Sequence, residues 1–248
     1  MEGTRRSVLG MPVDVLDMAG AIGAIDRAVG AGGRRLTVLA MNPEKVVALD
    51  KDPGMRRFFE GAFLVIPDGI GIVVALRLLL GVKAQRVAGA DLMQELCGLA
   101  ARRGYSVFLY GGTEEVSSRT AAELSRRHPS LKPIGRQNGF LDEMEMEAFV
   151  ERLNEVRPDF LFVGLGSPRQ ERWIQRHLSR LEIGVCQGVG GTFDTIAGTV
   201  TRTPLFLRSL GLEWVYRVTT QPQRLRRAAL AHPAFAVRVL ARALLRKT

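Results

Sequence analysis

The stretch YSVFLYGGTEEVSSRTAAELSRR, residues 105–127, decides the fold class. It begins with an apolar run of strand length, turns at two glycines, and continues with apolar residues at helical spacing. Strands that alternate with helices of about a dozen residues predict an α/β fold. We therefore expect a Rossmann-like parallel sheet core covered by helices on both faces. The same arrangement recurs after RLTVLAM (35–41), AFLVI (62–66), LKPIG (131–135), DFLFVGLG (159–166) and EIGVCQGVG (182–190).

The alternation of strands and helices stops at Gly198, and the charge changes there as well. The chain has a net charge of +10, and residues 199–248 hold ten basic residues and a single acidic one, Glu213. The sequence therefore predicts two units, an α/β core at 1–198 and a basic, helical C-terminal appendage at 199–248. Prolines divide that appendage into expected helices at 204–219, 222–230 and 233–246.

Composition points to a cytoplasmic protein. The two cysteines, Cys97 and Cys186, lie in apolar surroundings and are expected to be buried thiols of a reducing compartment. The N-terminus lacks the features of a signal peptide. The best apolar run, IVVALRLLL (72–80), is short for a membrane span and contains Arg77.

Candidate functional residues follow the predicted strands, because ligands of parallel α/β sheets gather at the carboxyl ends of the strands. Asp68 follows a buried strand in IPDGIG (66–71). Pro-Asp-Gly is also a common turn sequence, so a purely structural role stays open. As a functional group, a carboxylate at this position can serve as a general base. Asn42 is predicted to cap a helix that has Pro43 at its first position.

The segment GLGSPRQERW (164–173) has two interpretations. Ser167 and Gln170 fit a capping box at the start of a helix. The same helix start, with Arg169 beside it, could instead bind an anion. Neither this segment nor GVGGTFD (188–194) matches the dinucleotide-binding pattern, and no P-loop occurs, so no nucleotide cofactor is expected.

Two further positions are candidates with open alternatives. Gly111 and Gly112 form a tight strand-to-helix turn, and Glu114 and Glu115 in the next turn disfavour phosphate there, so a base or ribose contact is the better expectation. Arg86 lies in a predicted loop and is either a ligand contact or a solvated charge. Metal ligation is not expected, because the three histidines lack ligand spacing and DKD (50–52) fits a solvated helix end.

A set of motifs occurs in a fixed order along the chain: NPE (42–44), PDGIG (67–71), RVAGADL (86–92), FLYGG (108–112), GLGSPRQE (164–171), GVGGTFD (188–194) and GLEWVYR (211–217). Taken together, these motifs resemble the WecG/TagA/CpsF family of bacterial glycosyltransferases over about residues 5–230. The resemblance implies an inverting, metal-independent transfer of a sugar from a UDP-sugar. The implied donor carries N-acetylmannosamine or a related hexose, and the implied acceptor is a sugar on a polyprenyl diphosphate of cell-surface polysaccharide or teichoic acid synthesis.

Residue by residue, the resemblance gives Asp68 the role of catalytic base and places Asn42, Arg86 and Gln170 around it. It also implies that three arginines of the appendage, Arg217, Arg224 and Arg227, reach over this pocket. The chain departs from the family pattern at Ala40, where threonine is usual, and this leaves the identity of the donor sugar open.

The basic appendage fits such a function, because arginines bind diphosphates without a metal ion. Arg238, Arg242 and Arg246 are spaced to form one stripe on a helix whose other faces are apolar. A basic amphipathic helix suits an anionic membrane surface, although a plain solvated face is the alternative. The expected location is therefore peripheral, at the inner face of the cell membrane.

Two other functions compete with this interpretation. A strongly basic chain could bind nucleic acid, but the appendage has few aromatic residues for base stacking and the chain contains no recognisable nucleic-acid module. Nucleic acid is therefore not among the expected partners. A non-catalytic, membrane-associated protein of the same fold is the second alternative. The sequence leaves open whether the chain forms a homo-oligomer.

Overall fold

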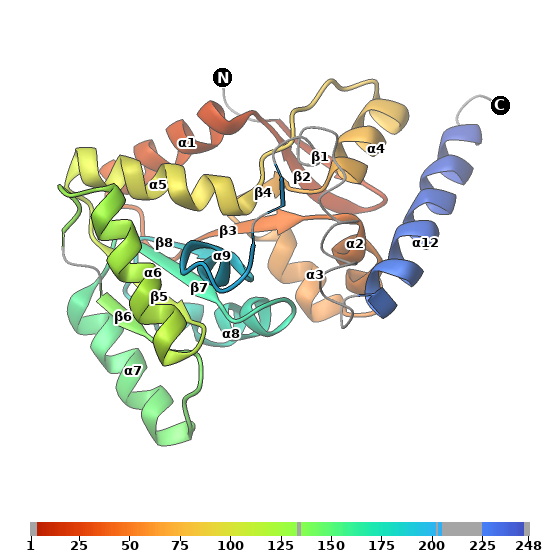
Figure 1. The fold of residues 1–248 in the computed structure, drawn as a ribbon. Coiled ribbons are helices and arrows are strands. Elements are labelled where there is room, and N and C mark those ends of the chain that lie inside the picture. Colours follow the sequence, from red (N-terminus) through yellow and green to blue (C-terminus); the bar gives the residue numbers. More distant parts are fainter. Residues whose placement is uncertain (1–3, 133–134, 202, 205–224, 246–248) are drawn as a thin grey trace.

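The computed structural model describes residues 4–132, 135–201, 203–204 and 225–245 (Figure 1). Its centre is a six-stranded sheet with the strand order β4-β3-β8-β7-β5-β6, in which every pairing is parallel. Helices cover both faces of this sheet, which confirms the predicted α/β class. The strands are β3 (Leu36–Met41), β4 (Leu64–Pro67), β5 (Val107–Gly111), β6 (Gly135–Gln137), β7 (Phe160–Gly164) and β8 (Val185–Gly188).

The strand predicted at 131–135 agrees with the structure at Gly135, where the edge strand β6 begins, whereas Leu131 and Lys132 lie outside any strand. A Cβ atom at Gly135 would lie 2.3 Å from Cδ2 of Phe108 on the neighbouring strand β5. The absence of a side chain therefore lets the β6 backbone lie against this ring.

A two-stranded antiparallel hairpin precedes the sheet and was not predicted. It consists of β1 (Thr4–Val8) and β2 (Met11–Val15). Asp14, which interrupts the apolar pattern of the sequence, is buried and forms a salt bridge of 2.8 Å with Arg5. Its Oδ2 also accepts a hydrogen bond of 2.7 Å from the backbone N–H of Val65. The polar residue that hid the strand in the sequence thus attaches the hairpin to β4.

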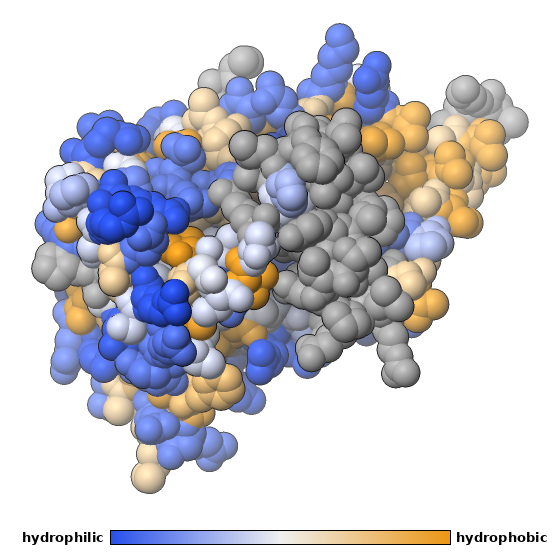
Figure 2. Space-filling view, in the orientation of Figure 1, coloured by the Kyte–Doolittle hydropathy of each residue, from blue (hydrophilic) through white to orange (hydrophobic). Residues whose placement is uncertain are grey.

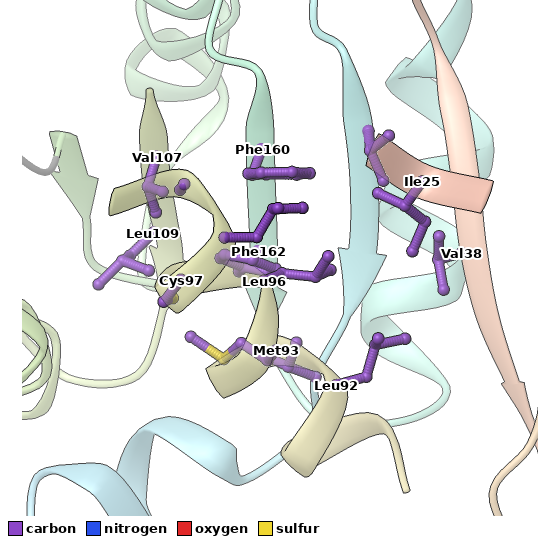
Figure 3. Packing of buried hydrophobic residues seen from close by; sticks show 14 of the residues in the cluster. Ile25, Val38, Leu92, Met93, Leu96, Cys97, Val107, Leu109, Phe160 and Phe162 are labelled. Atoms are coloured by element: carbon purple, nitrogen blue, oxygen red, sulfur yellow. The ribbon is translucent and has the colours of Figure 1, made fainter. Parts of the chain in front are cut away.

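One face of the sheet packs against helices α1, α5, α6 and α9. Alternate strand residues such as Val107, Leu109, Phe160 and Phe162 point to this side, where they meet Leu96 and other residues of α5 (Figure 3). Cys97 and Cys186 are both free and buried, as predicted, on opposite faces of the sheet. The helices are α1 (Met18–Gly30), α5 (Gly89–Arg103), α6 (Glu114–Arg127) and α9 (Thr192–Ile196).

The other face holds two adjoining groups of helices. α7 and α8 pack on β5 and β7 through an aromatic cluster of Phe108, Tyr110, Phe149 and Trp173. Helices α2, α3 and α4 cover β3 and β4 together with the hairpin. The helices are α2 (Pro43–Leu49), α3 (Pro53–Glu60), α4 (Ile70–Leu80), α7 (Glu143–Val156) and α8 (Arg169–His177), followed by a short 3-10 helix, Leu178–Arg180.

The C-terminal helix α12 (Leu225–Leu244) packs against α2 and α4 (Figure 1). Phe235 and Val239 are buried there in the same apolar cluster as the α4 residues. The prediction that Pro233 separates two helices is wrong, because it lies inside this single helix. Proline removes one backbone hydrogen bond, and the burial of Ala231 and Phe235 on either side of it holds the helix against the core.

The division into units at 1–198 and 199–248 stays a prediction. The helix expected at 204–219 lies almost wholly outside the described residues.

Candidate active site

Asp68 and Asn42 meet at the carboxyl edge of the sheet. Each comes directly after a strand, and the residues before them, Pro67 and Met41, are paired in register between β4 and β3. The backbone N–H of Asp68 donates to the carbonyl of Met41 at 3.0 Å. A Cβ at the next residue, Gly69, would lie 3.1 Å from Cβ of Asn42. The glycine of the PDG sequence therefore permits the close approach of the two strand ends.

The Asp68 side chain is held by a segment remote in sequence. The backbone N–H of Gly89, at the start of α5, donates to Oδ1 of Asp68 at 2.8 Å. Arg86, in the loop before α5, donates from Nε to the backbone carbonyl of Asp68 at 2.5 Å. The structure thus brings Asp68 and Arg86 together, as predicted. The half-buried carboxylate is bound from outside its own turn, which a turn-forming role alone does not require.

Asn42 is the helix cap that the sequence predicts. Its Oδ1 accepts from the backbone N–H of Lys45 at 2.9 Å, and Pro43 occupies the first position of α2. Because the side-chain oxygen serves the helix, the amide N–H₂ is the part of Asn42 that can donate to a ligand.

Gln170 does not form the predicted capping box. Helix α8 begins at Arg169 with Pro168 at the cap position and no side-chain cap bond. The Gln170 side chain is buried instead, and its Oε1 accepts from the backbone N–H of Gly190 at 2.8 Å. Its Nε2 donates to Glu171 at 3.0 Å. The prediction failed because this amide is used to tie α8 to the loop after β8.

Sequence reasoning missed a buried ion pair next to these residues. Lys45 of α2 lies 2.8 Å from Oε1 of Glu171, and its Nζ also donates to the carbonyl of Ala40 at 2.9 Å. Burial by itself raises the pKa of the Glu171 carboxyl, but the charge and hydrogen bond of Lys45, together with hydrogen bonds from Gln170 and the backbone, hold this pKa below its ordinary value. The sequence contains little sign of this ion pair, because Lys45 and Glu171 each resemble an ordinary solvated charge in the first turn of a helix.

Gln187 is a second buried polar residue that the sequence did not single out. Its Nε2 donates to the carbonyl of Gly89 at 2.9 Å, and the side chain is almost wholly buried in β8. Gly89 thus accepts a hydrogen bond from the sheet through its carbonyl and donates one to Asp68 through its N–H.

Gly111 and Gly112 lie at the same edge of the sheet but farther along it, because β8 and β7 separate β5 from β3. Both have positive φ angles, 135° and 69°, and form the predicted tight turn into α6. A Cβ at Gly111 would lie 2.4 Å from the carbonyl oxygen of Gly164. Backbone packing therefore explains Gly111, and the positive φ angle explains Gly112, while contact of either residue with a ligand stays a prediction.

The arginines predicted to reach over the site are not placed by the structure. Arg217 and Arg224 lie outside the described residues. Arg227 belongs to α12, but its side chain is also outside the described part.

The arginines of α12 lie differently from the prediction. Arg238 pairs with Asp50 at the end of α2, and Arg242 lines a cavity of about 470 Å³ between the hairpin, α4 and α12. Both arginines thus lie on the side of the helix that faces the body. Arg246 lies outside the described residues.

The outward face of α12 is apolar. Its residues Val237, Leu240 and Leu244 are between 57% and 68% exposed. Apolar residues of α4 are exposed nearby, and Figure 2 shows hydrophobic surface gathered over both helices. The expected basic outer stripe is therefore replaced, over the described residues, by an apolar one.

The acidic DKD segment forms the predicted helix ends. Asp52 caps α3 by accepting from the backbone N–H of Met55 at 2.9 Å, and Asp50 closes α2. Within the described ranges, His, Cys, Asp and Glu side chains form no group of three or more that could hold a metal ion. None of the helices in the described part of the chain combines the length and the apolar character needed to cross a membrane.

Comparison of the sequence with known proteins identifies a family for the chain. Residues 6–248 match the model of the glycosyl transferase WecG/TagA/CpsF family. The chain is 33% identical, over 87% of its length and 81% of the relative's, to the N-acetylglucosaminyldiphosphoundecaprenol N-acetyl-beta-D-mannosaminyltransferase of Bacillus subtilis (strain 168). It is 34% identical to the protein of the same name from Staphylococcus aureus (strain MRSA252), over 77% of this chain and 75% of that one. The chain therefore belongs to the WecG/TagA/CpsF family of glycosyl transferases.

Proposed function

We propose that the protein is an inverting hexosyltransferase that moves a sugar of the N-acetylmannosamine type, or a related hexose, from a UDP-sugar to a polyprenyl-diphosphate-linked acceptor. The observation that carries this proposal is the position of Asp68, whose carboxylate is held by Gly89 beside Asn42 and Arg86 at the carboxyl edge of the sheet. The names of both relatives, which specify a lipid-diphosphate-linked acceptor and a transferred N-acetyl-beta-D-mannosaminyl group, support the choice of substrates.

In the proposed reaction, Asp68 is the general base. The hydrogen bond from Gly89 fixes one carboxylate oxygen, and the other accepts the proton of the acceptor hydroxyl. The hydroxyl oxygen forms a bond to the anomeric carbon while the bond from that carbon to the UDP oxygen breaks. Attack from the opposite side inverts the configuration, and UDP departs as an anion.

Cationic side chains stabilise the departing diphosphate in this proposal, which makes the reaction independent of a metal ion. Arg86 lies beside Asp68 and can contribute from the core. Arg217, Arg224 and Arg227 complete the site from the appendage, a role that rests on the family resemblance. Asn42 and Gln170 contribute to the sugar pocket, and Gly111 and Gly112 to the nucleotide end.

The proposed location is the inner face of the cell membrane, where a lipid-linked acceptor is presented. The apolar outer face of α12 and the exposed residues Ile70, Val74 and Leu78 of α4 support a peripheral contact. These three α4 residues are spaced by four and therefore share one side of the helix. Helix α4 begins at Ile70, two residues after Asp68, so this apolar side of the helix starts close to the proposed site in sequence.

A binding and transfer experiment tests the proposal. UDP should raise the thermal midpoint of the protein more than GDP, CMP or NAD. The purified protein should also transfer sugar from UDP-N-acetylmannosamine to a polyprenyl-diphosphate acceptor, and EDTA should leave the rate unchanged. UDP binding and lipid binding without turnover would favour a non-catalytic family member. Salt-sensitive binding of generic DNA or RNA without a response to UDP would favour a nucleic-acid binder.

A further inference from the structure

We propose that the buried pair Lys45–Glu171 is a positioning device for the active site. In this inference, Glu171 fixes the orientation of the Gln170 side-chain amide, and the amide then fixes the loop at Gly190. The inference rests on the proposed function, which places Gln170 in the sugar pocket, and it adds the loop at Gly190 to that pocket.

The two residues connect three strand ends that carry candidate site residues. Lys45 follows Asn42 by three residues and binds the carbonyl of Ala40 at the end of β3. Glu171 belongs to α8, which follows β7, and its neighbour Gln170 binds Gly190 after β8. A chain of contacts therefore runs from β3 through α8 to the loop after β8.

Hydrogen-bond chemistry explains why a carboxylate is needed in this chain. A glutamine amide has a donor end and an acceptor end, and it can bind its surroundings in two orientations. An ionised Glu171 can only accept, so it turns the Nε2 of Gln170 towards itself. The Oε1 end is then directed to the N–H of Gly190, which requires an acceptor. The charge of Glu171 thus selects one of the two orientations.

Lys45 keeps Glu171 in the accepting state. The Glu171 side chain is only 4% exposed, and a carboxyl buried to this extent takes up a proton unless a cation is close. The Lys45 ammonium group, 2.8 Å away and itself 12% exposed, supplies that cation. Replacing a buried ion pair by well-packed hydrophobic residues of similar volume is often neutral or favourable for stability. A role in orientation therefore explains the charges better than a role in stability.

The Gln170 amide occupies a tightly packed position. A Cβ at Gly188, the last residue of β8, would lie 2.6 Å from its Nε2. The amide therefore lies across the backbone at the end of β8, where a change of orientation would displace the following loop. The second carboxylate oxygen of Glu171 is buried and has no hydrogen-bond partner, so the pair is not arranged to satisfy every polar atom.

A double-mutant cycle with steady-state kinetics tests the inference on the full-length enzyme. Glu171→Gln and Gln170→Ala should each raise the KM for the UDP-sugar about tenfold and leave the KM for the acceptor unchanged. The double variant should be no worse than either single one, because both changes remove the same contact to Gly190. Losses that add in the double variant would overturn the inference.

A neutral pair separates positioning from stability. Lys45→Met alone should lower the thermal midpoint, because the buried Glu171 carboxyl must then either stay charged without its cation or take up a proton. Lys45→Met combined with Glu171→Gln should regain the midpoint but keep the raised KM, whereas a purely structural pair would regain both.

The exposed ion pair Glu147–Arg180 supplies the control, and Glu147→Gln should change neither the KM for the UDP-sugar nor the thermal midpoint. A wild-type enzyme without any transfer would refute the proposed function itself. Wild-type transfer together with additive losses, or with full recovery in the neutral pair, would refute only the positioning role.

Discussion

The backbone N–H of Gly89 donates to the carboxylate of Asp68 at 2.8 Å, although the two residues are 21 positions apart in sequence. The carbonyl of Gly89 accepts from Gln187, a buried residue of β8. Gly89 therefore links the carboxylate of Asp68 to Gln187 in the interior of the sheet. This arrangement gives the proposed base a fixed position before any substrate binds, which favours catalysis by a positioned group.

Replacing Gly69 should disturb the site directly. In Gly69→Ala, the new Cβ would lie 2.9 Å from Cδ of Pro43 and 3.1 Å from Cβ of Asn42. The strand ends must then separate, and we expect a loss of roughly 1–3 kcal/mol of stability and a clear fall in turnover. Gly54→Ala is the matched control, because its nearest neighbour would be 3.6 Å away. Equal thermal midpoints and activities for the two variants would contradict this account of Gly69.

Replacing Gly111 should damage the sheet rather than ligand binding alone. Gly111→Ala combines a φ of 135° with a Cβ only 2.4 Å from the carbonyl oxygen of Gly164, so the pairing of β5 with β7 cannot persist unchanged. We expect a fall of several degrees in the thermal midpoint, measured by circular dichroism without ligand. A variant with the wild-type midpoint and weakened UDP binding would show instead that Gly111 serves the ligand.

The alternation of apolar runs and helical segments was sufficient to predict five of the six parallel strands closely. The hairpin was not predicted because Asp14 breaks its apolar pattern. Only the tertiary structure shows that the Asp14 carboxylate pairs with Arg5 and accepts a hydrogen bond from the Val65 N–H. For the site, the proximity of Asp68 and Asn42 followed from parallel strand ends, whereas the position of Arg86 beside Asp68 was implied only by the family resemblance. The partners of Gln170 did not, because helix-capping rules describe local contacts and its actual partners lie on other segments.

Stability should fall as the pH drops below about 6.5, partly because of His177. Burial, followed by the charges of Arg180 and Arg176, lowers the pKa of this histidine from 6.5. His177 therefore binds a proton near pH 6.5 in the unfolded chain but only at a lower pH in the folded protein. Between these two pH values the unfolded state binds more protons, and lowering the pH favours unfolding. His177→Phe, which keeps an aromatic ring beside Trp173, should reduce the difference between urea midpoints at pH 7.5 and 5.5. If the difference between the two urea midpoints were unchanged, His177 would not contribute to the loss of stability at low pH.

Membrane contact should depend on the apolar face of α12. Leu240 and Leu244 are 57% and 68% exposed, and burying such side chains in lipid contributes about 1.5–3 kcal/mol each. Leu240→Ser with Leu244→Ser should therefore weaken binding to anionic liposomes at least tenfold in a sedimentation assay. Met144→Ser, on the exposed side of α7, is the control and should bind like the wild type. Equal binding by all three proteins would exclude this face as the contact.

The most direct test of the central claim is the rate of sugar transfer from UDP-N-acetylmannosamine to a polyprenyl-diphosphate acceptor by wild-type protein and by Asp68→Asn. Asparagine keeps the shape of the side chain and an oxygen that can accept from Gly89, but it cannot take the proton of the acceptor hydroxyl. We predict that the variant retains the wild-type thermal midpoint and affinity for UDP while its turnover falls at least ~100-fold. Turnover close to the wild-type rate in a folded, UDP-binding variant would contradict the assignment of Asp68 as the catalytic base.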